Sequence, residues 1–244
     1  MNITVIGAGG SIGREVAHLI VEERLLDCDQ RLKLVGNSQG ESAKSLYGLA
    51  VDLMDAYAEV TPAIDVALSP ETIEGDLIIM AGGATIPTTH QTGPISRDFL
   101  AENNAPIFER YASALAKHGH GNEIVVCISN PNELAVAIFA KHLGRKRVIG
   151  MGAFLDSLRF RKEIALDLGI RRQCIHGFII GEHGPNLVPL WSSVHIYGMQ
   201  KEALNRALAH IRKGHTTAHF REDVMAAMEK LKALVTEGEV RSAY

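Results

Sequence analysis

Apolar and polar residues follow two alternating patterns along the chain, and these patterns predict an α/β protein. Short apolar runs are each followed by a longer segment with apolar residues at helical spacing. This alternation is typical of parallel strands joined by crossover helices. The expected strands are residues 3–7, 31–36, 76–83, 123–129 and the start of 147–169, and the expected helices are residues 13–25, 42–57, 101–119, 133–144 and the end of 147–169.

The pattern changes near residue 150. Residues 174–181 and 188–198 have the composition of strands close in sequence, which favours an antiparallel pair, and charged helices are expected over 201–214 and 219–236. We therefore predict a Rossmann-type, doubly wound parallel sheet over residues 1–150. A smaller mixed α+β domain is expected over 151–244.

The composition excludes several classes of function. A formal charge of −3 leaves no basic footprint for nucleic acid, and no apolar run is long enough to span a bilayer. The 3 cysteines are far apart without a CxxC motif, so we interpret them as buried thiols of a reducing compartment. The chain begins with the strand-like sequence NITVIG rather than a signal peptide. We expect a cytoplasmic protein that binds no membrane, nucleic acid or metal.

A glycine-rich loop lies where the first expected strand meets the first expected helix. In VIGAGGSIGR, Gly7, Gly10 and Gly13 let the backbone turn tightly and approach a pyrophosphate, which the helix N-terminus then stabilises. Such glycines alone also suit an ordinary tight turn. Their position after the first strand of an alternating chain favours dinucleotide binding.

The second expected strand ends without the usual acidic residue. NAD-binding proteins commonly carry a carboxylate about 20 residues after the glycine loop, where it binds the ribose hydroxyls. Here the strand ends Leu34-Val35-Gly36-Asn37-Ser38. One interpretation is that Asn37 and Ser38 donate hydrogen bonds to the extra phosphate of NADP. The other is that NAD binds here with one contact fewer than usual. Both cofactors remain open.

Four further segments bring polar side chains to the expected ends of strands and starts of helices. Arg97 opens a helix, Asn130 follows a strand, Asp156 and Arg159 share a helical face, and His183 stands between glycines in GEHGPN. Taken singly, these residues are compatible with solvated charges, a surface ion pair, a turn residue and a loop histidine. Their combination on a dinucleotide-binding scaffold favours an active site.

The motifs GAGGSIG, SRDFLAEN, ISNP, GAFLDSLRF and GEHG occur in that order. On these motifs the chain resembles the lactate/malate dehydrogenase family along essentially its whole length. The resemblance implies an NAD- or NADP-dependent oxidoreductase that acts on small L-2-hydroxy acids and 2-oxo acids. Residues 1–150 would bind the dinucleotide and 151–244 the substrate. A homodimer or homotetramer is implied, with the helix over 42–57 as a candidate contact surface.

The same resemblance implies a role for each polar residue. His183 would donate and accept the proton, and Asp156 would orient His183. Arg159 would bind the substrate carboxylate at two points, a geometry that lysine lacks. Arg97 would polarise the reacting carbonyl, and Asn130 would contact substrate and nicotinamide. The residues implied to contact the cofactor are Gly7, Gly10, Ser11, Ile12, Gly13, Asn37, Ser38, Gly82, Asn103, Ile128 and Asn130.

The sequence departs from the family pattern at two places that concern the substrate. The loop before Arg97 looks longer than usual and lacks the arginine of malate enzymes, while Gln91 falls at a lactate-type position. The glycine spacing and LKLVGNS resemble malate enzymes, so malate, lactate and a bulkier acid remain open. The family also extends further, and Ser242 falls near its pocket hydroxyl. We therefore expect either a truncated sequence or a shortened form, the latter compatible with a non-catalytic dinucleotide-binding protein.

Overall fold

The computed structural model describes residues 1–38, 42–84, 97–181 and 187–214. The chain divides into two compact units, Met1–Gly150 and Met151–Ala243. Each unit has its own hydrophobic core. None of the helices in these residue ranges is both long and apolar enough to cross a bilayer.

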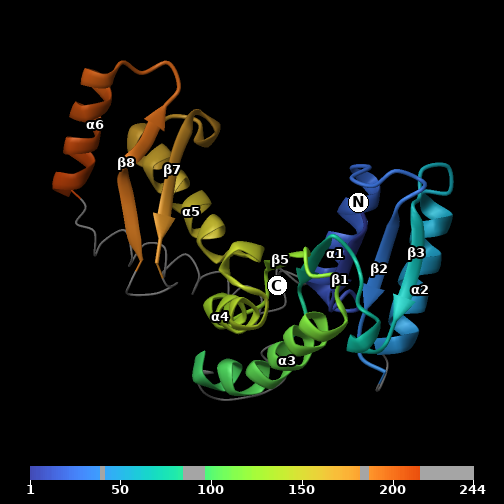
Figure 1. The fold of residues 1–244 in the computed structure, drawn as a ribbon. Helices are drawn as coiled ribbons and strands as arrows, with labels where there is room; N and C mark the ends of the chain where they lie inside the picture. Colours follow the sequence, from blue (N-terminus) through green and yellow to red (C-terminus); the bar gives the residue numbers. More distant parts are fainter. Residues whose placement is uncertain (39–41, 85–96, 182–186, 215–244) are drawn as a thin grey trace, which may run out of the picture. The chain divides into compact units, whose positions relative to one another are not determined.

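The first unit is built on a parallel sheet of six strands in the order β3-β2-β1-β4-β5-β6 (Figure 1). The strands are β1 (Ile3–Ile6), β2 (Arg31–Val35), β3 (Ala63–Ala67), β4 (Leu77–Met80), β5 (Ile124–Cys127) and β6 (Val148–Gly150). The strand order runs outward in both directions from the β1–β4 pair. Ligands of open α/β sheets bind at such a switch point, beyond the carboxyl ends of the strands.

Helices cover both faces of this sheet, which confirms the predicted doubly wound fold. The helices are α1 (Ser11–Glu22), α2 (Ser42–Ala56), α3 (Arg97–His118) and α4 (Asn132–Leu143), with short 3-10 turns η1 (Pro70–Thr72) and η2 (Arg145–Arg147). Successive residues of a strand face opposite sides of the sheet. Val5 and Leu34 therefore belong to the core with α1 and α2, whereas Ile6 and Met80 belong to the core with α3 and α4.

Strand β3 was not among the expected strands. It lies at the edge of the sheet, with Ala63 exposed and the next three residues only half-buried, so it has no continuous apolar run. The residue at its centre, Asp65, forms an ion pair with Arg31 on β2. A strand of this composition is stabilised mainly by its pairing with β2, which local periodicity does not reveal.

The expectation that all the cysteines are buried is wrong. Only Cys127 is buried, whereas Cys28 is exposed and Cys174 is half-buried. Cys28 lies in the polar turn between α1 and β2, where no side-chain packing covers it. At Cys127, burial on β5 raises the pKa to about 12, so its thiol stays protonated and unreactive near neutral pH.

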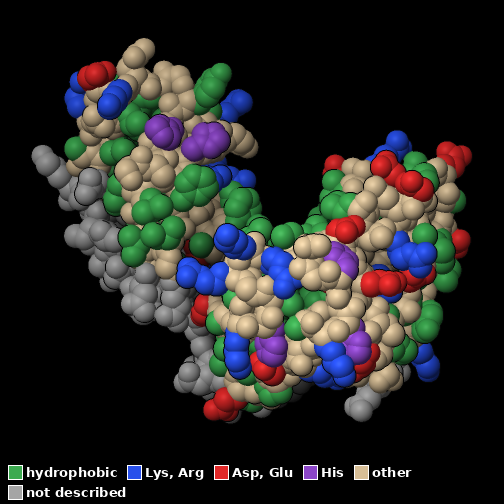
Figure 2. All heavy atoms as spheres, viewed as in Figure 1, with side chains coloured by type: hydrophobic (Ala, Val, Ile, Leu, Met, Phe, Trp, Pro, Cys, Tyr) green, Lys and Arg blue, Asp and Glu red, His purple; other side chains and the backbone are tan. Residues whose placement is uncertain are grey.

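The second unit is a mixed α+β structure. It comprises α5 (Gly152–Leu168), a 3-10 turn η3 (Arg172–Cys174), the predicted antiparallel pair β7 (Ile175–Ile180) and β8 (Val188–Ile196), and α6 (Lys201–Gly214). Phe160, Ile179 and Leu208 belong to its core. Phe178 and Ile180 on β7 are exposed, and Figure 2 shows hydrophobic side chains on the surface of this unit. The helix expected over 219–236 lies outside the described residues.

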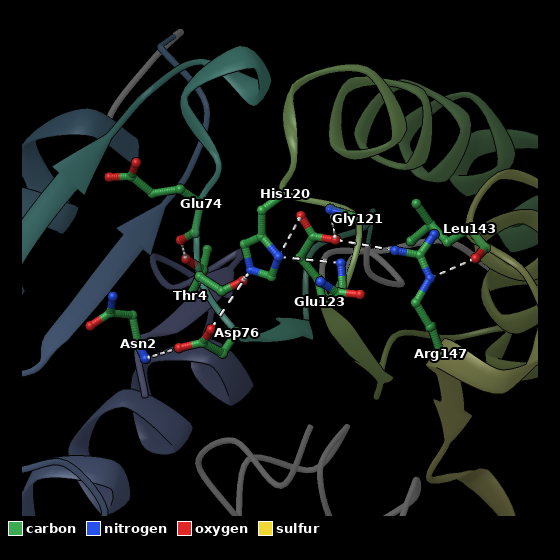
Figure 3. Close-up of polar contacts among 11 residues, drawn as sticks. Asn2, Thr4, Glu74, Asp76, His120, Gly121, Glu123, Leu143 and Arg147 are labelled. Atoms are coloured by element: carbon green, nitrogen blue, oxygen red, sulfur yellow. Dashed lines mark hydrogen bonds and ion pairs between the residues drawn. The ribbon is translucent and has the colours of Figure 1, made fainter.

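A polar network joins the amino ends of the strands in the first unit (Figure 3). The backbone N–H of Asn2 donates to Asp76 at 2.7 Å, and Arg147 pairs with Glu123 at 3.2 Å. The side chain of Glu123 is only 1% exposed, and within the described residues its Oε1 makes no hydrogen bond. The cation of Arg147 therefore compensates a buried carboxylate. This network is at the edge opposite the glycine loop, so the carboxyl edge stays available for a ligand.

We expect the substitution Arg147→Ala to lower the free energy of unfolding by about 3 kcal/mol, because it leaves the Glu123 carboxylate buried without its cation. Urea denaturation followed by circular dichroism measures this change. The matched control is Arg145→Ala, since Arg145 is an exposed arginine two positions away. Equal stability losses in the two variants would show that the ion pair does not support the sheet.

Candidate active site

The glycine loop approaches the end of β4 so closely that side chains are excluded. A Cβ on Gly7, whose φ is +84°, would lie 2.4 Å from the Cα of Gly82, and a Cβ on Gly13 would lie 2.2 Å from the carbonyl oxygen of Gly7. Helix α1 begins at Ser11 with a glycine cap and no acidic residue in its first turn. The loop therefore fits a pyrophosphate at the N-terminus of the helix.

The same loop is bonded to the end of β2. The backbone N–H groups of Gly7 and Ala8 donate to the carbonyl of Val35 at 2.8 and 3.2 Å. Asn37 and Ser38, which follow this strand, are both exposed. The pyrophosphate loop and the residues that face the ribose in a dinucleotide-binding fold are thus held together.

A cavity of about 630 Å³ extends along β2 and β3 beside this strand end. Its walls include Ser38 and Ser69 after the two strands, Lys33 on β2 and Arg110 on α3. Lys33 pairs with Glu74 at 2.5 Å. Arg110 was not identified from the sequence, because its lining of a cavity beside β2 depends on the packing of α3 on the sheet.

The carboxyl ends of β4 and β5 are joined by backbone and hydroxyl contacts. The N–H of Ile128 donates to the carbonyl of Met80 at 2.9 Å, and the hydroxyl of Ser129 donates to the carbonyl of Gly82 at 2.6 Å. Asn130, the next residue, is exposed. The structure therefore brings the predicted cofactor residues Gly82, Ile128 and Asn130 together with Gly7 at one edge of the sheet.

Two adjacent asparagines on α3 have different environments. Asn103 is exposed, and its amide donates to the carbonyl of Phe99 in its own helix at 2.7 Å. Asn104 is 1% exposed and donates to the carbonyl of Asn130 at 2.6 Å. Asn104 was not identified from the sequence. Its spacing of four residues from buried Leu100 and buried Phe108 was the available signal, since it places Asn104 on the buried face of the helix.

In the second unit, Asp156 and Arg159 form the expected pair on α5. Arg159 Nη1 and Asp156 Oδ1 are 3.0 Å apart, and their side chains are 16% and 2% exposed. Burial excludes the alternative of a pair on a solvated face. The bond uses one of the five N–H donors of the guanidinium group, a group that can also form a two-point contact with a carboxylate.

The buried pair is adjacent to a contact between α5 and the end of β7. The hydroxyl of Ser157 accepts a hydrogen bond from the N–H of Ile179 at 2.9 Å and donates to the carbonyl of Ala153 at 2.7 Å. Strand β7 ends at Ile180, three residues before His183 in the sequence. His183, Gln91 and Ser242 lie outside the described residues. Arg97 begins α3, but its side chain is also outside them.

The fold and the glycine loop define a dinucleotide-binding α/β protein, and comparison with known proteins identifies its family. The family model for the lactate/malate dehydrogenase NAD binding domain matches residues 1–150. The chain belongs to the lactate/malate dehydrogenase family.

Individual relatives and structures agree with this assignment. The malate dehydrogenase of Methanothermobacter marburgensis is 29% identical over 235 residues, covering 95% of this chain and 67% of the relative. The L-2-hydroxycarboxylate dehydrogenase (NAD(P)(+)) of Methanocaldococcus jannaschii is 32% identical over 213 residues, 84% of this chain and 64% of the relative. The lactate dehydrogenase of Cryptosporidium parvum, crystallised with lactic acid and nicotinamide adenine dinucleotide, is 28% identical with a TM-score of 0.70, covering 95% of this chain and 70% of that one. Across five curated relatives, these two included, the chain spans 60% to 67% of the relative's length.

Proposed function

We propose that this chain carries the catalytic residues of a nicotinamide-dependent dehydrogenase that interconverts a small L-2-hydroxy acid and its 2-oxo acid. The main support is the buried pair of Asp156 and Arg159. A carboxylate and a guanidinium group on a helix joined to β7 are the groups needed to orient a histidine after that strand and to bind a substrate carboxylate. The family membership of the first 150 residues supports the nicotinamide cofactor.

The residues of the first unit fit the cofactor. The glycine loop and the N-terminus of α1 would hold the pyrophosphate, and the ends of β4 and β5 would hold the nicotinamide half, with Asn130 beside it. When bound, the cofactor supplies the hydride for reduction of a 2-oxo acid and accepts it in the reverse reaction. The protein residues then bind the acid and move a proton.

In the proposed reaction, His183 donates a proton to the carbonyl oxygen as the carbonyl carbon is reduced. Asp156 favours the imidazolium form and orients the ring, since a nearby carboxylate raises the proton affinity of histidine. Arg159 binds the substrate carboxylate, and Arg97 stabilises the negative charge that develops on the oxygen. In the oxidation direction, His183 takes the proton back.

Malate, lactate and larger 2-hydroxy acids are the alternative substrates. Curated relatives include malate dehydrogenases and an L-2-hydroxycarboxylate dehydrogenase. The loop over 82–96 lacks the arginine of malate enzymes, and it looks longer than the corresponding loop of those enzymes. A second candidate function is a non-catalytic dinucleotide-binding protein, which the match of the NAD binding domain to residues 1–150 would also satisfy.

Turnover with a panel of substrates separates the two functions. Nicotinamide absorbance is followed with oxaloacetate, pyruvate and a branched 2-oxo acid, each with NADH and NADPH. We expect turnover with at least one pair, and the substitution His183→Asn to lower kcat by about 10²–10⁴-fold, since that is the usual contribution of a general acid. Cofactor affinity should stay unchanged. Cofactor binding without turnover of any pair would count against the enzyme and favour a truncated or non-catalytic dinucleotide-binding form.

For the cofactor, we propose that NADPH is accepted as well as NADH. Support comes from the strand end Gly36-Asn37-Ser38, which carries no carboxylate to repel a 2′-phosphate. The adjoining cavity contributes the hydroxyl of Ser38 and the positive charge of Arg110.

The substitution Asn37→Asp tests this proposal for the cofactor. We expect NADPH affinity to fall about tenfold, because a carboxylate at this position repels the phosphate, whereas NADH affinity stays equal or rises. Fluorescence titration with each cofactor measures both constants. Equal losses of affinity for NADH and NADPH would indicate a general disturbance of the loop. Unchanged NADPH affinity would show that the 2′-phosphate does not bind beside residue 37.

We also propose that the chain forms a homodimer or homotetramer through α2. Tyr47, Val51 and Met54 are exposed and follow one another at helical spacing, which makes an apolar stripe on this helix. We expect the substitution Val51→Asp to shift the molecular mass by light scattering from oligomer towards monomer. The control Lys117→Asp changes an exposed residue of α3. A monomeric wild-type chain would refute this proposal.

A further inference from the structure

We propose that Asn104 is a positioning residue that holds the ends of β4 and β5 in the arrangement that binds the cofactor. This inference rests on the proposed function, because it concerns the same edge of the sheet. Asn104 lies two turns inside α3 and is 1% exposed. It acts through backbone groups of residues 84 and 130, and it is distinct from Asn103, whose amide faces its own helix.

Each polar atom of the Asn104 side chain has a partner in one of two loops. Its Oδ1 accepts a hydrogen bond from the N–H of Ala84 at 2.5 Å. Its Nδ2 donates to the carbonyl of Ala84 at 3.2 Å and to the carbonyl of Asn130 at 2.6 Å. One amide group therefore connects the segment after β4 to the segment after β5.

The chemistry of these contacts selects asparagine. Aspartate is similar in shape, but its carboxylate has no donor for the two carbonyl groups and repels them. Alanine removes all three hydrogen bonds, and the N–H and carbonyl of Ala84 are then no longer joined to the carbonyl of Asn130. Neighbouring space is also restricted, because a Cβ on Gly83 would lie 3.1 Å from Oδ1 of Asn104. The side chain thus fits this position in both size and hydrogen-bonding pattern.

Asn104 fixes the backbone of Asn130, the residue that the family resemblance implies contacts both substrate and nicotinamide. The carbonyl of Asn130 is held by Asn104, while the residue itself is exposed. The preceding Ser129 is bonded to the carbonyls of Met80 at 3.0 Å and Gly82 at 2.6 Å. Two hydrogen-bonding side chains thus hold successive residues of the loop, and the backbone of Asn130 has little freedom to turn its amide away from a bound cofactor.

The test uses the full chain with Asn104→Ala and Asn104→Asp, and Glu102→Gln as the control on an exposed position of the same helix. Amide hydrogen exchange measures how firmly Asn104 holds the two loops. Fluorescence titration with NADH measures how far cofactor affinity depends on that contact. In Asn104→Ala we expect exchange at Ala84 to be at least tenfold faster, with exchange in β1 unchanged, and NADH affinity to fall about tenfold. Both quantities are measured below the Tm of the variant.

The aspartate variant supplies a pH signature that a purely structural role would not produce. Once protonated, the carboxyl group introduced by Asn104→Asp again donates one hydrogen bond. NADH affinity of this variant should therefore recover from pH 8 to pH 5.5 relative to the wild type and Glu102→Gln at the same pH. Variants that lose Tm but keep wild-type NADH affinity would overturn the inference. If the wild-type chain binds no NADH, the proposed function fails, and exchange at Ala84 alone then decides whether Asn104 holds the loops.

Discussion

The close approach of backbone at the β1–β4 switch point is the constraint on which the first unit depends. Gly7 lies so near Gly82 that a side chain could not be accommodated there. The parallel pairing of β1 with β4, in the register Ile6 to Met80, brings these glycines together. The same contact places the N-terminus of α1 beside the ends of β4 and β5. Binding of a pyrophosphate and positioning of Asn130 therefore follow from one packing arrangement.

The two edges of this sheet have different roles. At the amino edge, charged groups are paired within the protein, as Glu123 is with Arg147, and they stabilise the strands. At the carboxyl edge, the polar groups are largely backbone atoms held by Ser129 and Asn104. A buried side-chain amide costs conformational entropy, but it holds a loop without placing a net charge beside a cofactor site.

In the second unit, the buried pair of Asp156 and Arg159 has a different physical character. Burying an ion pair is costly unless both groups are well bonded, and such a pair adds little to stability compared with apolar residues. Phe160 and Ile164 on the same helix already supply the apolar packing. The catalytic roles proposed for Asp156 and Arg159 would account for charges on this buried face.

Local patterns in the sequence were sufficient to predict the alternation of strands and helices, the glycine loop and the Asp156–Arg159 spacing. Each of these depends on residues close in the chain, whose periodicity or conformational preference is visible without a partner. Edge strand β3, the exposure of Cys28 and the cavity wall at Arg110 depended instead on tertiary packing. The same holds for the choice between Asn103 and Asn104. Both have the same side chain, and only the packing of α3 against the ends of β4 and β5 decides which amide is buried and must satisfy the backbone groups around it.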